Sequence, residues 1–194
     1  DADGHADTLR ASLQRVGPDA AAFVLVDAGD HPRARRLQRL RDAWVTAGDV
    51  VVLGPCPHRD PCPALVRERD WCHDVLEKRL PPRLAAFARA VGRDADVMAA
   101  SWLVGARADG DVRAGDGVVV IGEPQRDKGR VRLPVCGPAG LRFVQALKRH
   151  RGAFDTVAAL PRGARLPPLA ADGDTAHVDD AAGLSLPGPD DGAP

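Results

Sequence analysis

Residues 50–63 read Val-Val-Val-Leu-Gly-Pro-Cys-Pro-His-Arg-Asp-Pro-Cys-Pro, an apolar run that passes directly into a loop with two cysteines. The apolar run predicts a strand buried on both faces, as in a parallel sheet. Prolines flank both Cys56 and Cys62, and they hold the loop backbone in extended and turn conformations. Such a loop has little reason to bury a bare thiol and good reason to present thiolates to a metal.

Two further cysteines complete the set, Cys72 and the distant Cys136, with the spacing Cys-x5-Cys-x9-Cys-x63-Cys. Three neighbouring thiols and a distant fourth predict a four-sulfur metal site that ties two segments together. The spacing is neither the paired Cys-x2-Cys of most zinc ribbons nor a common ferredoxin pattern. Thiolates suit zinc and iron–sulfur clusters alike, so the spacing leaves both open.

Two plainer interpretations of the cysteines are isolated core residues and a pair of disulfides. The flanking prolines argue against the first. Nothing favours an oxidising compartment for the second, because the first residues lack the basic start and apolar core of a secretory signal. We expect His58 and His73 to make hydrogen bonds beside the site or to contact RNA, and Trp71 to shield the site from solvent.

Working outward, residues 22–27 form a second apolar run, and residues 31–47 between the two runs predict a helix. Leu37, Leu40 and Trp44 share one face of this helix, and five arginines occupy the rest. Residues 22–54 therefore predict a strand–helix–strand unit with a right-handed crossover. The expected fold class is α/β, with this unit joined to a four-cysteine region with a β-hairpin.

The later chain predicts less regular structure. Residues 65–90 are expected to be mostly helical, residues 94–104 are ambiguous, and residues 140–149 are expected to form a short helix. Residues 117–122 and 129–135 predict a hairpin that ends at Cys136. We expect three regions: an α/β part (1–54), a four-cysteine and basic part (55–166), and a disordered acidic tail (167–194).

The formal net charge is zero, but it hides a basic body and an acidic tail. Between Gln125 and Arg165 ten Lys or Arg face two aspartates, whereas the residues after Arg165 carry six aspartates and no Lys or Arg. This distribution is typical of a polyanion-binding protein. The candidate RNA contacts are Arg126, Lys128, Arg130, Arg132, Lys148 and Arg149. Because aromatic residues are few, we expect backbone and shape readout. No apolar run is long enough for a membrane span, and we expect a cytoplasmic protein.

Several of these residues also carry a family resemblance. The segments are Pro55-Cys56-Pro57-His58, Cys62-Pro63, Asp70-Trp71-Cys72-His73, Ile121-Gly122-Glu123-Pro124, Lys128-Gly129, Leu133-Pro134-Val135-Cys136 and Lys148-Arg149. In this order they resemble the methyltransferase-like assembly factors of the small ribosomal subunit, which include mitochondrial methyltransferase-like protein seventeen and bacterial homologues. The resemblance covers residues 23–165.

The resemblance implies a [4Fe–4S] cluster held by Cys56, Cys62, Cys72 and Cys136, with zinc as the alternative metal. It also implies that residues 55–166 bind small-subunit ribosomal RNA and that residues 1–54 form a partial Rossmann-like sheet, made of the late strands of a class I S-adenosylmethionine-dependent methyltransferase. The glycine-rich cofactor loop of that domain is not in this chain, so no catalytic residue and no S-adenosylmethionine site are expected here.

Three functions follow from these observations. The favoured one is a cluster-stabilised factor that docks on small-subunit ribosomal RNA. The alternative is an S-adenosylmethionine-dependent RNA methyltransferase that is completed by a partner chain or by a missing N-terminal half. The third is a zinc-stabilised module without a role in RNA binding.

Overall fold

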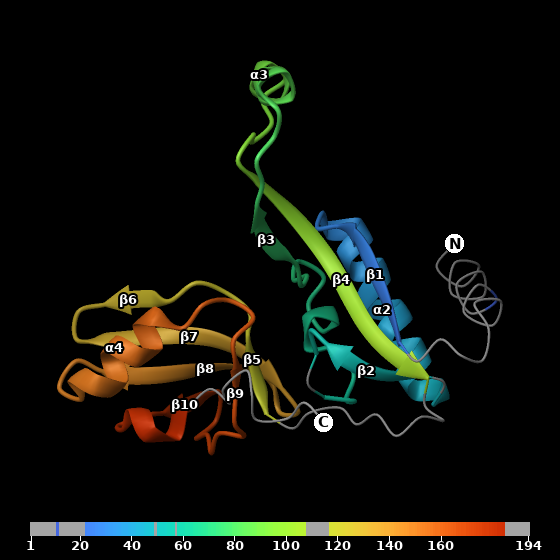
Figure 1. Cartoon of the computed structure of the whole chain (residues 1–194). Coiled ribbons are helices and arrows are strands. Elements are labelled where there is room, and N and C mark those ends of the chain that lie inside the picture. The colour runs from blue at the N-terminus through green and yellow to red at the C-terminus, as the bar shows by residue number, and fades with distance from the viewer. Residues whose placement is uncertain (1–10, 12–21, 49, 57, 108–116, 185–194) are drawn as a thin grey trace.

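A computed structural model describes residue 11 and residues 22–48, 50–56, 58–107 and 117–184. Within them, two β-sheets lie next to each other, and a helical arm projects away from both (Figure 1). The mixed α/β class expected from the sequence is therefore correct. No helix in the described ranges is long and apolar enough to cross a membrane.

The first sheet has the strand order β1-β4-β2, and β3 pairs with an outlying part of β4. Its strands are β1 (Ala22–Ala28), β2 (Val50–Gly54), β3 (Asp74–Glu77) and β4 (Val97–Arg107). β4 runs antiparallel to both β1 and β2, so the two strands of the predicted strand–helix–strand unit are parallel but not adjacent. The ambiguous residues 94–104 thus supply the central strand. Gly105 allows the close packing there, because a Cβ would lie 2.5 Å from the ring of Phe23 and 2.8 Å from Val50.

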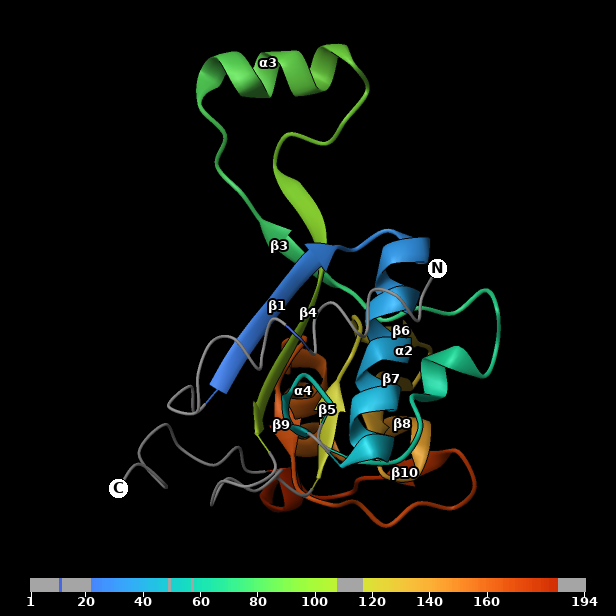
Figure 2. The ribbon, with the colours of Figure 1, turned by 90° about the vertical axis from the view of Figure 1, so that its right-hand side faces the viewer.

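Helix α2 (His31–Ala47) covers one face of this sheet (Figure 2). The Asp30 side chain caps its first turn by accepting a hydrogen bond from the Arg33 amide, and Gly48 ends it at a φ of 74°. Leu37, Leu40 and Trp44 of the helix pack against Val50, Val52 and Leu103 of the sheet. The predicted helix and its apolar face are confirmed.

The arm consists of β3, the helix α3 (Pro82–Ala90) and the return into β4. The sequence analysis was wrong about most of residues 65–90, because only the part after Pro81 is an α-helix. A short 3-10 turn, η1 (Pro63–Leu65), and the strand β3 precede it. Leu84, Phe87 and Val91 of the arm are more than half exposed.

The second sheet has the order β10-β8-β7-β5-β9, with β6 paired to the outer part of β7. Its strands are β5 (Val118–Val120), β6 (Gln125–Asp127), β7 (Arg130–Gly137), β8 (Gly140–Leu147), β9 (Arg165–Leu166) and β10 (Thr175–His177). Helix α4 (Arg151–Ala159) packs against one face and closes a core with Val131, Leu133, Val144 and Ala146. The two predicted strands do pair antiparallel, as β5 and β7, but part of the segment expected to be their turn forms the strand β6, which pairs with β7. The tight turn lies at Lys128 and Gly129, where Gly129 has a φ of 86°.

Two expectations for this region are wrong. Residues 140–149 are mostly the strand β8 and not a helix, because Val144 and Ala146 alternate with the outward Phe143 and Gln145. The tail expected to be disordered is ordered in part: β10 pairs in parallel with β8, and the 3-10 turn η2 (Ala181–Leu184) buries Leu184 in the core. The composition of this segment predicted disorder, but pairing with β8 provides hydrogen bonds for its backbone. Residues 185–194 lie outside the described part.

Candidate metal centre

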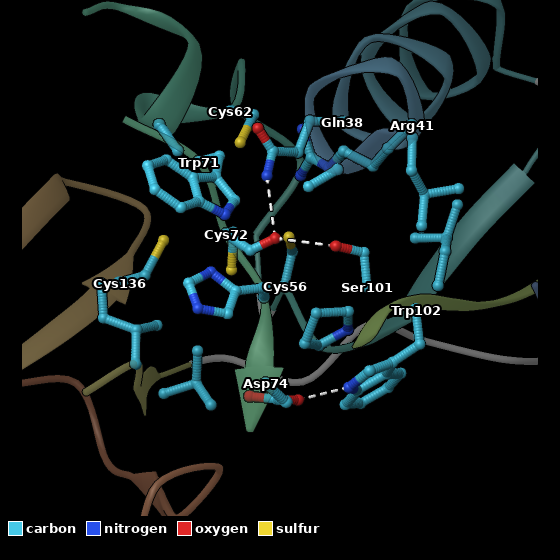
Figure 3. A pocket seen from close by; sticks show the side chains of 18 of the residues that line it. Gln38, Arg41, Cys56, Cys62, Trp71, Cys72, Asp74, Ser101, Trp102 and Cys136 are labelled. Atoms are coloured by element: carbon cyan, nitrogen blue, oxygen red, sulfur yellow. Dashed lines mark hydrogen bonds between the residues drawn. The ribbon is translucent and has the colours of Figure 1, made fainter. Parts of the chain in front are cut away.

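The four cysteines converge on one cavity of about 390 Å³ between the two sheets (Figure 3). Cys56 follows β2, Cys62 precedes η1, and Cys72 precedes β3. Cys136 lies near the end of β7 in the second sheet. All four are free thiols, and all four line the cavity. The fold therefore brings together residues that are up to 80 positions apart in the chain.

Helix α2 fixes the first half of the cysteine loop with a buried arginine. The Arg41 side chain is only 2% exposed, and its guanidinium donates to the carbonyl oxygens of His58 and Asp60. Its neighbour Asp42 accepts the backbone N–H of Cys62 at 2.9 Å and pairs with Arg41 at 2.7 Å. A charge-assisted network thus fixes the backbone from His58 to Cys62.

The same helix fixes the second half of the loop. Arg35 donates to the carbonyl oxygens of Ala64 at 3.0 Å, Arg67 at 2.9 Å and Asp70 at 2.6 Å. The carbonyl oxygen of Cys72 accepts from Gln38 Nε2 at 3.2 Å and from Ser101 Oγ at 3.1 Å (Figure 3). These contacts hold a loop with little regular secondary structure against a rigid helix and the central strand.

Three polar contacts join the two sheets around the cavity. Arg162, after α4, pairs with Asp74 of β3 at 2.7 Å, and Asp74 also accepts from the indole N–H of Trp102. Arg165 of β9 donates to the carbonyl oxygen of Leu53 at 2.5 Å. The buried His58 lies with Nε2 3.5 Å from the sulfur of Cys136. His58 thus contacts a cysteine, as expected for a hydrogen-bonding residue beside the site.

An aromatic stack forms one wall of the cavity. Trp71 stacks on His73 with a centroid separation of 5.3 Å and meets His31 edge-on at 5.2 Å. Its indole N–H donates to the carbonyl oxygen of Gly29 at 3.1 Å. Trp71 is 39% exposed, so it stands between the thiols and solvent.

The electrostatics of the cavity favour neutral thiols when no cation is present. Burial raises the pKa of Cys62 to about 11 and that of Cys72 to about 12, and it also raises the pKa values of Cys56 and Cys136. The second cause for Cys62, Cys72 and Cys136 is the negative charge of neighbouring thiolates. Arg41 acts in the opposite direction on Cys56. Four neighbouring thiols whose pKa values are all raised by burial are a donor set that a cationic group would deprotonate and bind.

The thiols surround a space and do not meet at one point. Among the described residues, no three His, Cys, Asp or Glu side chains are close enough together to hold a single metal ion. The thiols of a single-ion site lie about 4 Å apart, because each zinc–sulfur bond is about 2.3 Å.

The candidate RNA contacts separate into two groups. Lys128 lies in the β6–β7 turn and Lys148 and Arg149 lie after β8, and the two turns are adjacent because the Lys148 N–H donates to the Gly129 carbonyl oxygen at 2.8 Å. Arg130 and Arg132 lie on the face of β7 that points away from α4. Arg126 differs, since its guanidinium donates to the Ala158 carbonyl oxygen at the end of α4.

The residues of α2 that hold the cysteine loop were not identified from the sequence, in which Arg35 and Arg41 belong to the arginine-rich face opposite the apolar one. The spacing of residues along the helix could have identified them. Ala34, Leu37, Gln38 and Arg41 repeat at the three- and four-residue spacing of a buried stripe, and all four are buried. The two arginines were misassigned because charged side chains are rarely buried without a partner, and their partners here are backbone carbonyls distant in sequence.

A comparison with family models gives one match. The family described as mitochondrial small ribosomal subunit Rsm22 matches residues 7–167, a range that contains all four cysteines and both sheets up to β9. No curated protein matches the chain.

Proposed function

Because the chain belongs to the mitochondrial small ribosomal subunit Rsm22 family, its function is related to that subunit, and we propose that it acts as an iron–sulfur protein that binds small-subunit ribosomal RNA. The observation that carries the proposal is the convergence of Cys56, Cys62, Cys72 and Cys136 on one cavity between two sheets. The family also supports a role in assembly of the subunit.

The cavity suits a [4Fe–4S] cluster better than a single zinc ion. A cube of four irons and four sulfides occupies a volume and needs thiolates spread around it, which is how the four sulfurs lie. The chemistry of the donor set also fits, since four thiolates are the usual ligands of such a cluster. Trp71 on one side and the Arg41 network on the other would limit water at the site. The cluster would supply a crosslink between the sheets.

The RNA part of the proposal is supported by charge. Lys128, Lys148 and Arg149 gather at two adjacent turns, and Arg130 and Arg132 continue the positive surface along β7. Cationic side chains that follow one surface are suited to phosphate contacts, whose affinity falls steeply with salt. Arg126 is left out of this surface because it binds a carbonyl of α4. We place the protein in the cytoplasm, where reducing conditions keep the four cysteines available as ligands.

S-adenosylmethionine-dependent methyl transfer remains the second candidate. The parallel strands β1 and β2 with α2 agree with the end of a doubly wound sheet, in which an antiparallel strand is common. The chain has no glycine-rich loop that could hold the cofactor. We therefore expect no binding of S-adenosylmethionine by this chain alone, which equilibrium dialysis with the labelled cofactor would check.

The decisive experiment is an anaerobic purification followed by an absorbance spectrum and by analysis for iron, sulfide and zinc. A broad band in the visible range with about four irons and four sulfides per chain is expected. One zinc per chain and no colour would overturn the cluster. The RNA-binding part of the proposal is tested by measuring the affinity for small-subunit ribosomal RNA at increasing salt concentrations. An affinity that did not fall with salt would contradict the phosphate contacts.

A further inference from the structure

A helix covers only one face of the second sheet, and on the other face the cysteine loop reaches only the end that carries Cys136 and Leu141. α4 packs against the face that carries Val131, Leu133, Val144 and Ala146, each fully buried. The opposite face carries the alternate residues of β7 and β8, which are partly or fully exposed along most of their length. We call this second surface the open face and define it by Gln125, Arg130, Arg132, Phe143, Gln145 and His177. An antiparallel sheet can expose one face to water, and the polar side chains on such a face usually show no particular arrangement.

The open face instead carries an ordered row of hydrogen-bonding side chains. Gln125 of β6 pairs with Arg132 of β7, Arg132 pairs with Gln145 of β8, and Gln145 pairs with His177 of β10. The row therefore crosses four strands and presents an amide, a guanidinium, a second amide and an imidazole. Gln145 Nε2 and His177 Nδ1 lie 3.4 Å apart, so these two side chains are already oriented toward each other.

A flat platform lies next to the row. The guanidinium of Arg132 stacks on the ring of Phe143 at 5.2 Å, and Phe143 pairs across the strands with Pro134. Within the described residues, Arg132 has no ion pair and no hydrogen-bond partner, and its buried Nε is unsatisfied. An aromatic ring thus holds the guanidinium in place and leaves its N–H groups for a ligand.

The charge of the open face selects the ligand class. Asp127 is the only carboxylate within β6, β7, β8 and β10, and it is already paired with Arg130 at 3.0 Å. Lys128, Lys148 and Arg149 add positive charge at one end of the face. A row of amide and guanidinium groups beside an aromatic platform, with cations at its end, matches unpaired bases and their phosphates. In a duplex the base faces are stacked on one another and the Watson–Crick edges are paired, so neither is free for such a surface.

We propose that the open face binds single-stranded RNA, with an unpaired base stacked at Phe143 and Arg132 and base edges bound by Gln125, Gln145 and His177. The choice of RNA rests on the proposed function, whereas the choice of unpaired nucleotides rests on this geometry. The face also leads to the metal centre, because Cys136 shares its side of β7 and Leu141, on the same side of β8, lines the cysteine cavity. The bound strand would therefore run from the basic turns toward the cysteines.

The test measures the affinity of the metal-loaded protein for a labelled oligouridine and for an RNA duplex of equal length. Phe143→Leu and Gln145→Ala are expected to weaken binding of the single strand, Phe143→Leu by about tenfold, and to leave the salt dependence unchanged. Arg132→Ala is expected to weaken binding and to lower the slope of log affinity against log salt by about one. Phe87→Leu and Arg83→Ala on α3 are the matched controls, because they make the same changes on the projecting arm and should bind as the wild type does.

The outcomes separate this inference from the proposed function. Equal affinity of the wild type for duplex and single strand, or wild-type affinity of both Phe143→Leu and Gln145→Ala, would overturn the open-face site and leave ribosomal RNA binding intact. If the wild type bound neither RNA, both proposals would fail. Phe143→Trp gives a second measurement. Its aromatic ring should keep the affinity that Phe143→Leu loses, and a base stacked on the indole should quench the tryptophan fluorescence.

Discussion

Arg41 shows how a single buried charge can organise a cysteine loop. Its guanidinium is enclosed between α2 and the loop, and its partners are two carbonyl oxygens and one carboxylate. The positive charge of its guanidinium therefore lies beside the cysteine loop. That charge favours thiolates, and it offsets part of the cost of burying them.

Replacing Arg41 with methionine should therefore loosen the loop. The carbonyl groups of His58 and Asp60 would lose their donor in a buried place, and we expect the free energy of unfolding to fall by about 3 kcal/mol. Metal content per chain should fall with it. Urea unfolding and iron analysis of the purified variant measure both. Arg39→Met is the matched control, because Arg39 is exposed on the same helix and should change neither.

The thiols also predict a pH dependence for the metal-free protein. Their folded-state pKa values are raised, from 9.0 to about 11 for Cys62 and about 12 for Cys72. The folded state thus holds these protons when the unfolded state has released them, so stability falls as the pH rises from 9 toward 12. Urea midpoints across this range should decline for the metal-free protein. A flat profile would contradict the burial of the thiols.

At the scale of elements, β7 is the strand that connects the two halves of the molecule. It carries Cys136 at one end and the Arg130 and Arg132 pair at the other, and it lies at the centre of the second sheet. A ligand bound at Cys136 therefore anchors the whole sheet and not one loop. The three other ligands are attached to the first sheet and its loop.

Cys136→Ser should remove the cluster and this anchor together. Since binding energy at a structural metal site is folding energy, we expect the melting temperature to drop by about 10 °C and to match that of metal-free wild type. Differential scanning calorimetry under anaerobic conditions measures both proteins. A variant that kept its metal and its melting temperature would show that Cys136 is not a ligand.

The arm, by contrast, should be dispensable for the fold. Only Ala85 of α3 is buried, and β3 and β4 pair below the helix without it. Replacing residues 79–93 with a short glycine–serine turn is expected to leave iron content and melting temperature unchanged. Calorimetry and metal analysis decide the point. A loss of either would show that α3 supports the body of the protein.

Sequence analysis found the elements whose signals are local. β1, β2 and α2 were predictable because their apolar runs and end residues are strong, and the β5–β7 hairpin because its strands are rich in valine. β4 was missed because its alanine-rich core side, with Ala100 and Ala106, fits a helix as well as a strand. β10 was missed because three residues of strand are formed only by pairing with β8.

The convergence of the four cysteines was predictable from the sequence, but the residues that support them were not. The spacing of the cysteines indicated four ligands, and the structure brings their side chains to one cavity. Arg35, Gln38 and Arg41 were not recognised, because their contacts are backbone carbonyls that a sequence pattern does not display. The Gln125–Arg132–Gln145–His177 row was hidden for a related reason, since it exists only through strand register.

At the scale of the whole molecule, few polar contacts join the two sheets. The described residues supply Arg162–Asp74, Arg165–Leu53 and His58–Cys136 across the cavity. Removing the metal should therefore loosen the sheets from each other before it unfolds either one. Small-angle scattering is expected to give a larger radius of gyration after anaerobic chelation, and reconstitution should reverse it. Unchanged dimensions would mean that these contacts alone fix the arrangement.

The order of the ligands along the chain has a consequence for synthesis. Cys56, Cys62 and Cys72 leave the ribosome before Cys136, which follows 64 positions after Cys72. A nascent chain thus passes through a stage with three thiols and no fourth, when oxidation or capture of the wrong ion is easiest. The centre closes only when β7 has joined its own sheet. A complete cluster could then form only after both sheets had folded, so the colour of the purified protein would report that folding is complete.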